Sequence, residues 1–434
     1  MKALRARLVT HPPAFRALLL SDVAMQLAMM VGQVAIPWWI SDHGGAVHLA
    51  IYGTVMAITM LISLPLLAPV GDRWPKSRLI ASSLALFSVV TLILALLASF
   101  DYYDLWLVIA LKALSVTANA VLGPASFSIA AELVPPERLS DGLGLQKSAQ
   151  AIGRLVGPAL GGLALALFGT AAALWLHVLL LVIASLAAWR IIVPPADPHR
   201  ASSHEPWWPA LRAGFLAKWR IPLERYWTAT AFLMMLFFLP VLGLLMPLKV
   251  RELGLSGAWL GACEAGISFG MLIGSLGGAD WLSHRFGRFR ASFGAMMGSG
   301  LAQMLVGATT SPYLLVLGFV VVGLSLAVVQ MVGQTHRMLA MPPDFRARMT
   351  AVNMMVLQIA GALGPMLAGW GLLYITAGQV YLLFGFSYGF AALGFLRVPG
   401  YRNFLELDHE AVKGWYGRFY PQLFGKESSA ADKP

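Results

Sequence analysis

The chain has 434 residues, of which 58% are hydrophobic and 12% are charged, whereas about 25% of a soluble globular chain is charged. Too few polar residues remain to cover a core of this size, so the composition excludes a soluble multi-domain enzyme and indicates a protein that crosses the membrane many times. The net charge of +11 fits the Lys and Arg that collect in cytoplasmic loops, and it does not call for a nucleic-acid partner. Cys263 is the only cysteine, which excludes an internal disulfide and a cysteine-based metal site.

Apolar runs long enough to cross a bilayer, about 20 residues each, follow one another along the chain. The first run is too long for the core of a signal peptide, so we expect it to stay as a membrane span. The twelve runs are residues 16–40, 49–70, 79–99, 105–131, 146–168, 171–193, 226–250, 257–280, 291–309, 313–340, 349–373 and 377–396. The sequence therefore predicts an all-α membrane protein with twelve transmembrane helices.

The order of these runs predicts the domain organisation. Two six-helix halves are expected at residues 1–193 and 226–396, joined by a cytoplasmic linker at 194–225 and followed by a cytoplasmic tail at 397–434. The distribution of basic residues supports this arrangement, because 27 of the 31 Lys and Arg lie at the termini, in alternate loops or in the middle stretch. The positive-inside rule then predicts a multi-pass protein of the cytoplasmic (inner) membrane with both termini in the cytoplasm.

The linker itself contains an amphipathic pattern. Trp208, Leu211, Phe215 and Trp219 share one helical stripe, and basic residues flank it. A helix that lies on the cytoplasmic face of the membrane is the natural interpretation. A linker with no further role is the alternative.

An internal repeat relates the two halves. The segment Val134-Pro135-Pro136-Glu137, with Gly157-Pro158 after it, recurs 207 residues later as Met341-Pro342-Pro343-Asp344, with Gly364-Pro365 after it. Two homologous halves are typical of transporters whose substrate site lies between them near the middle of the membrane.

Three motifs carry a resemblance to a known family. The loop from Ala68 to Arg78, with Asp72-Arg73, resembles the signature of the major facilitator superfamily between helices 2 and 3, although Pro75 departs from it. The segment Gly153–Gly162 resembles the helix-5 motif of antiporters. Preceded by Glu132-Leu-Val-Pro, it is similar to the drug:proton antiporter-3 branch, which includes macrolide and siderophore exporters. The resemblance implies a major facilitator fold and secondary transport.

Charged and polar residues inside the spans are candidates for function, because a charge in the membrane costs about 2.5–3.5 kcal/mol or more. Polar residues repeat at helical spacing on four of the predicted helices, which is the pattern expected around a water-filled cavity. The predicted cavity residues are Gln26, Gln33, Lys112, Asn119, Arg154, Ser268, Gln330 and Gln334. Hydrogen bonding between helices, without transport chemistry, is the alternative.

Asp22 and Glu264 are the candidates for proton coupling, because a coupled transporter needs a group that gains and loses a proton during its cycle. Asp22 and Arg154 lie at similar depth, so we expect them to form a pair that opens and closes. The alternative role of Asp22 is a fixed ion pair, and that of Glu264 is to bind a cationic substrate. The helix 2–3 loop supplies a candidate gate, formed by Asp72, Arg73, Lys76, Arg78 and Glu132, with a purely topogenic charge cluster as the alternative.

The sequence thus predicts a proton-coupled exporter of amphiphilic small molecules, such as drugs or siderophore-like metabolites, working by alternating access. It contains no P-loop and no His-Glu-x-x-His motif, so we expect no enzyme activity, no cofactor and no metal. The expected partners are a small-molecule substrate, protons and membrane lipids, and a monomer suffices. A lipid or lysolipid translocator, a proton-coupled importer and a non-transporting receptor remain as alternatives.

Overall fold

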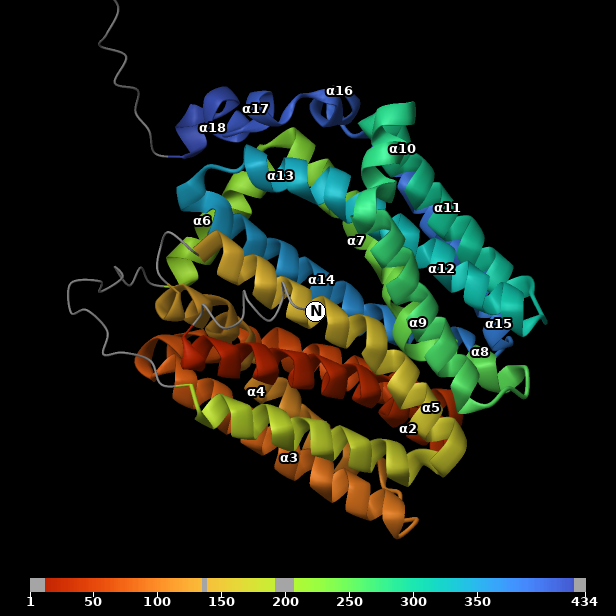
Figure 1. Cartoon of the computed structure of the whole chain (residues 1–434). Coiled ribbons are helices and arrows are strands. Elements are labelled where there is room, and N and C mark those ends of the chain that lie inside the picture. Colours follow the sequence, from red (N-terminus) through yellow and green to blue (C-terminus); the bar gives the residue numbers. More distant parts are fainter. Residues whose placement is uncertain (1–11, 135–138, 192–206, 425–434) are drawn as a thin grey trace, which may run out of the picture. The chain divides into compact units, whose positions relative to one another are not determined.

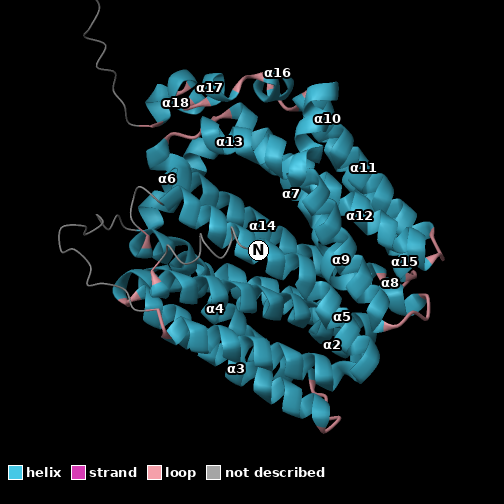
Figure 2. Cartoon of the chain, in the orientation of Figure 1, coloured by secondary structure: helices cyan, strands magenta, loops and turns pink. Residues whose placement is uncertain are grey.

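A computed structural model of the chain describes residues 12–134, 139–191 and 207–424. Within these ranges the regular elements are helices joined by short loops, with no strand (Figure 2). Lipid favours this architecture, because each backbone N–H and C=O in hydrocarbon needs a partner and a helix supplies it from the same segment. The predicted all-α class is confirmed over the described residues.

Four long helices form the first part of the chain, red to yellow in Figure 1. They are α2 (Pro13–Arg73), α3 (Lys76–Ser99), α4 (Leu105–Leu133) and α5 (Leu139–Trp189). Helices α2 and α5 each contain one glycine outside the helical region, Gly45 (φ 58°) and Gly169 (φ 81°). Glycine adopts a positive φ without steric cost. Each glycine therefore separates two of the predicted runs within what is otherwise one continuous helix.

Most of the helices that follow are shorter, and they are more often interrupted (Figure 1). In chain order they are α6 (Trp207–Arg220), α7 (Pro222–Pro240), α8 (Met246–Glu252), α9 (Gly257–Ile273), α10 (Ala279–Phe286), α11 (Arg288–Ala308), α12 (Pro312–Val329), α13 (Thr335–Ala340), α14 (Pro343–Gly371), α15 (Ala377–Ala392), α16 (Tyr401–Glu406), α17 (His409–Val412) and α18 (Trp415–Phe419). Helix α6 coincides with the amphipathic pattern of the linker. Its place at the membrane surface stays a prediction.

Single π-helical turns interrupt three of the later helices. They are η3 (Val241–Leu245), η4 (Gly274–Gly278) and η5 (Gln330–Gln334). Such turns widen the helix locally and are frequent at functional sites. Two of the predicted cavity residues, Gln330 and Gln334, begin and end η5, so the polar stripe of this helix lies on a local distortion.

Nine helical segments of the described chain are long and apolar enough to cross a membrane. Two of them, Pro13–Leu64 and Leu145–Trp189, contain the interruptions at Gly45 and Gly169. All twelve predicted runs lie on helices, but α11 is not among the nine segments. Twelve membrane crossings therefore stay a prediction.

By its internal packing the chain divides into two compact units. The first unit comprises Met1–Ser202 and Met246–Ala265, and the second comprises Ser203–Leu245 and Gly266–Pro434. The core of the first unit is formed by buried residues such as Phe15, Leu84 and Ile129. The core of the second unit includes Phe404 and Tyr416, so much of what the sequence suggested was only a tail is packed against the helical bundle.

Glycines allow close contact between two helices of the first unit. A Cβ atom on Gly153 would come within 2.5 Å of the Gln26 Cβ, and one on Gly157 within 2.5 Å of the Met30 Cβ. Both glycines lie on α5 and face α2. The small residues therefore let two helix backbones approach closely, which fixes the position of the polar groups that both helices carry.

Candidate functional site

Asp22 lies on α2 in the first unit and is only 3% exposed. Its Oδ2 accepts a hydrogen bond of 2.7 Å from the Gln146 amide, and the Gln150 amide lies 3.5 Å from the same oxygen. Both glutamines lie one turn apart on α5, and Gln146 also donates to the Ser126 carbonyl at 3.3 Å. The carboxyl group is therefore held by neutral donors.

The predicted pair of Asp22 with Arg154 is wrong in this structure. Among the described residues, the partners of the Asp22 carboxylate are the two amides, and Arg154 is exposed. Helix α5 begins at Leu139, earlier than the hydrophobic run suggested. Gln146 consequently reaches the depth of Asp22, while Arg154 lies eight residues, about 12 Å, further along the helix axis. The sequence analysis did not predict these two glutamines as partners of Asp22, although their i, i+4 spacing at an apolar run is a signal in the sequence.

Lys112 and Asn119 lie on α4 and line a cavity of the first unit that holds about 360 Å³ of space, counting its open mouth. Helices α2, α3 and α5 complete its wall. The residues that line it are Met29, Phe87, Thr91, Lys112, Ser115, Val116, Asn119, His177 and Leu181. The structure thus brings one predicted polar stripe together with a histidine from α5 around one cavity.

The other predicted cavity residues are dispersed. Gln26 and Ser268 are partly buried, and Gln33 and Gln330 are exposed. Glu264 on α9 is 8% exposed and shares a helix face with Ser268, one turn away. The substrate role of these residues stays a prediction.

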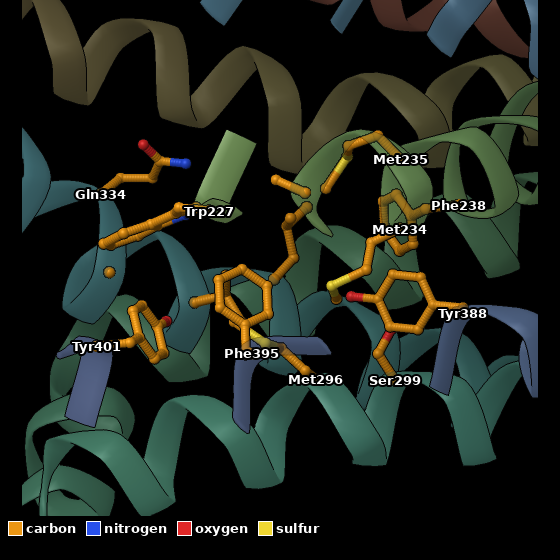
Figure 3. Close-up of a pocket in the computed structure, with 14 residues that line it drawn as sticks. Trp227, Met234, Met235, Phe238, Met296, Ser299, Gln334, Tyr388, Phe395 and Tyr401 are labelled. Atoms are coloured by element: carbon orange, nitrogen blue, oxygen red, sulfur yellow. The ribbon is translucent and has the colours of Figure 1, made fainter. Parts of the chain in front are cut away.

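The second unit contains an apolar cavity of about 540 Å³ of space, counting its open mouth (Figure 3). Its wall combines methionine and aromatic side chains with few polar groups. The residues that line it are Trp227, Ala231, Met234, Met235, Phe238, Met296, Ser299, Leu326, Val329, Gly333, Gln334, Tyr388, Phe395 and Tyr401. Trp227 and Gln334 lie at one end and Phe238 and Tyr388 at the other (Figure 3). Flexible thioethers beside aromatic rings suit apolar groups of varied shape.

A buried ionic cluster lies next to this cavity in the second unit. Glu224, on the first turn of α7, is 0% exposed and receives hydrogen bonds from three side chains. Arg337 Nη2 lies 2.7 Å and Lys218 Nζ 2.5 Å from its Oε2, and the Tyr416 hydroxyl donates to its Oε1 at 2.6 Å. Thr228 accepts from both cations, at 2.8 Å from Arg337 and 3.3 Å from Lys218.

The cluster ties together four elements that are distant in sequence. Lys218 comes from α6, Glu224 from α7, Arg337 from α13 and Tyr416 from α18. The Arg337 guanidinium also lies over the Trp227 ring, 5.0 Å from its centroid. Sequence reasoning missed this cluster, because Lys218 and Arg337 were counted only as cytoplasmic charges. The signal for this cluster in the sequence was Glu224, an acidic residue at the start of an apolar run.

The predicted gate falls largely outside the described side chains. Helix α2 ends at Arg73 and α3 begins at Lys76. The side chains of Asp72, Arg73 and Glu132 lie outside the described part of the structure, whereas Lys76 is partly buried and Arg78 is exposed. Within the described residues, no group of three His, Cys, Asp or Glu is arranged to hold a metal ion.

Comparison with known proteins defines the family. Residues 18–365 match the model of the Major Facilitator Superfamily, and the chain belongs to this family of membrane transporters. The chain is a multi-pass membrane protein and a transporter rather than an enzyme. No curated protein matches the sequence.

Solved structures show the same fold at low sequence identity. The nucleoside transporter NupG is 14% identical, with a TM-score of 0.69 over 89% of this chain and 98% of that one. The peptide transporter POT in complex with sulfate is 15% identical, with a TM-score of 0.67 over 92% and 96%. A bacterial homologue of the iron transporter ferroportin is 14% identical, with a TM-score of 0.67 over 88% and 98%. Identities this low support the fold alone, and the branch of the family stays open.

Proposed function

We propose that the protein exports amphiphilic small molecules, such as drugs or siderophore-like metabolites, across the cytoplasmic membrane in exchange for protons. The buried Asp22 carboxyl, held by the amides of Gln146 and Gln150, is the observation that carries this proposal. Both termini lie in the cytoplasm in this proposal, and one copy of the chain completes the transport cycle by alternating access.

The environment of Asp22 suits a group that exchanges a proton. Protonation of the Asp22 carboxyl group breaks no ion pair, because the described partners of this group are neutral amides. The Oδ2 atom that accepts from Gln146 remains an acceptor when the proton resides on the other oxygen. Both protonation states therefore keep the same hydrogen bond, which lowers the cost of cycling between them.

Glu264 is the second candidate for coupling. It is 8% exposed on α9 and has Ser268 on the same helix face one turn away. A buried carboxyl group within a membrane segment can carry a proton when the transport cycle opens it to water. We assign it either this role or the binding of a cationic part of the substrate.

The apolar cavity of the second unit supports the amphiphilic class of substrate. Met234, Met235 and Met296 adapt their shape, while Trp227 and Tyr388 offer flat faces for a ring. A wall of this kind accepts many apolar groups with modest selectivity. The residues proposed for the gate are Asp72, Arg73, Lys76, Arg78 and Glu132, which form ion pairs in one state and separate in the other.

Dye retention in cells that lack their own efflux pumps tests the proposal. Cells that make the protein should hold less amphiphilic dye than control cells, and a protonophore should abolish the difference. Asp22→Asn should hold dye at the level of the control cells. Asp104→Asn is the matched control, because it makes the same chemical change at the Asp104 carboxylate that caps α4 at 2.7 Å, and asparagine also caps helices well.

The outcome separates export from its alternatives. Dye that accumulates under a proton gradient indicates an importer, and competition by lysolipid without dye transport indicates a lipid translocator. If Asp22→Asn transports as the wild type does while Glu264→Gln does not, coupling belongs to Glu264. Dye levels indifferent to the protein, the protonophore and both variants reject proton-coupled export of this class.

A further inference from the structure

The cavity of the first unit contains a cation but no acid. Lys112 lies on its wall with Ser115 and Asn119 on the same face of α4, and Thr91 faces it from α3. None of the residues that line the cavity is Asp or Glu. A carboxylate to balance the ammonium group is thus missing from this part of the structure.

The Lys112 ammonium has no hydrogen-bonding or ion-pairing partner among the described residues. Asp22 on α2, a charged residue within the same unit, is engaged by Gln146 and Gln150 instead. A charged side chain within a membrane segment is costly unless it is paired or faces a polar space. This cost of an unpaired charge indicates that an anion from outside the chain enters the cavity and pairs with the Lys112 ammonium.

A second unsatisfied group lies on the same wall. His177 is 2% exposed, and its Nδ1 has no hydrogen-bonding partner. The ring packs against Gly32, where an added Cβ would come within 2.3 Å of the His177 Cε1. The absence of a side chain at this position on α2 therefore makes room for the imidazole beside the cavity.

Together these groups form a site for an anion. The ammonium of Lys112 donates three hydrogen bonds, neutral His177 donates one from a ring nitrogen, and the Asn119 amide and the hydroxyls of Ser115 and Thr91 add further donors. The apolar side chains of Met29, Phe87 and Leu181 complete the wall. Donors around a cation with an apolar surround match a carboxylate on an apolar body.

We infer that this cavity binds the carboxylate of the transported substrate, so that the protein carries amphiphilic organic acids. Lys112 is the charged ligand, and His177 and Asn119 orient the two oxygens. The inference rests on the proposed transport function and narrows its substrate class. The cavity receives the acid group, and its open mouth leaves the adjoining part of the substrate outside the wall of donors.

Binding to the purified, full-length protein in lipid nanodiscs tests the inference without relying on transport. The probes are naphthyl alkanoic acids of increasing chain length, each paired with its primary amide, which has nearly the same shape but no charge. Isothermal titration should show binding of the acid and about tenfold to hundredfold weaker binding of the amide, as expected for a hydrogen bond to a charged group. A phosphate monoester of the same naphthyl body shows whether the site prefers a carboxylate or accepts oxyanions in general; tighter binding of the phosphate overturns the carboxylate assignment.

Variants locate the site. Lys112→Met should lose the preference for the acid, and Lys112→Arg should keep part of it. Lys147→Met is the matched control, because Lys147 is exposed on α5, and it should bind the acid as the wild type does. Gly32→Ala should weaken binding by displacing His177. Elution volume and melting temperature confirm that each variant is folded.

The results distinguish this inference from the proposed function. Equal binding of acid and amide, or wild-type binding of the acid by folded Lys112→Met, overturns the anion site. Acid binding that depends on Lys112, with no protonophore-sensitive transport, keeps the site and rejects proton-coupled export. Protonophore-sensitive export of neutral dyes that Lys112→Met leaves intact, together with equal binding of acid and amide, keeps export and rejects the anion site.

Discussion

Two buried carboxylates of the described chain, one from each unit, are held in different ways. Asp22 in the first unit is 3% exposed and Glu224 in the second is 0% exposed. Asp22 accepts hydrogen bonds from two neutral amides, whereas Glu224 is bound by two cations and a phenol. Burial is therefore nearly the same at both sites, and only the charge of the partners differs.

The difference separates a group suited to proton exchange from one suited to structure. Protonation of Glu224 would leave Lys218 and Arg337 buried without a counter-charge, which is costly. Protonation of Asp22 leaves no charged group without its counter-charge among its hydrogen-bonding partners, which are neutral amides. The same residue chemistry thus supports an exchangeable site in one unit and a permanent tie between four helices in the other.

Glu224→Gln should give the largest loss of stability. Removal of one partner from a buried ion pair costs about 3–5 kcal/mol, because the remaining charges stay buried and uncompensated. Chemical denaturation of the purified protein in detergent measures the change. Glu410→Gln is the control, because the Glu410 side chain is 82% exposed in its pair with Lys413, and such pairs contribute at most about 1 kcal/mol. Wild-type stability of Glu224→Gln would remove the structural role of the cluster.

Tyr416→Phe should give a smaller loss, of about 2 kcal/mol, because it deletes one hydrogen bond to a charged group. The two cations remain on Glu224, so the charge balance is kept. The same denaturation experiment measures it, with limited proteolysis to report whether α18 stays packed. Tyr420→Phe changes the same ring chemistry nearby and serves as control. A loss as large as that of Glu224→Gln would show that ring packing, rather than the hydroxyl, holds the tail.

Asp22→Asn should change the free energy of unfolding by about 1 kcal/mol or less, because asparagine keeps an oxygen that accepts from Gln146. Transport should nevertheless be lost, since the amide does not carry a proton through the cycle. The comparison of denaturation with dye retention in the same variant is the sharpest test of the contrast between the two carboxylates. A stability loss of several kcal/mol would place Asp22 in the same structural class as Glu224.

Lys218→Met should have the smallest effect at pH 7, and the effect should depend on pH. Burial, with the neighbouring Arg337 guanidinium, lowers the pKa of Lys218 from 10.5 to about 8 against the opposing effect of Glu224. Between about pH 8 and 10.5 the unfolded chain binds this proton and the folded chain does not, so the contribution of Lys218 to stability rises with pH. Denaturation curves measured across this pH window should show the free energy of unfolding of the wild type rising relative to that of Lys218→Met. At pH 7 we expect the two to differ by less than about 1 kcal/mol, because Arg337 alone balances Glu224. A difference that falls as pH rises would contradict the assignment.

Single charged residues in the sequence were enough to predict much of the candidate site. Asp22, Lys112 and Glu264 stand out in apolar runs, and the structure places Asp22 and Glu264 among the buried groups and Lys112 on a cavity wall. The sequence did not predict the partners of these residues. Gln146 and His177 lie far from Asp22 and Lys112 in sequence, and the depth estimate that favoured Arg154 failed because helix α5 begins at Leu139.

The sequence by itself determined the helical class and the helical runs, whereas the two six-helix halves that the Pro-Pro and Gly-Pro repeat indicates stay a prediction. These properties depend on composition and on local period, because lipid requires apolar side chains and an internally bonded backbone wherever the chain crosses. Only the tertiary structure decided which buried charges are balanced. It joined Lys218, Arg337 and Tyr416 around Glu224, and it left Lys112 facing a cavity without an acid. Charge balance depends on where each helix starts and on the direction each side chain faces, and both are set by the packing of one helix against another.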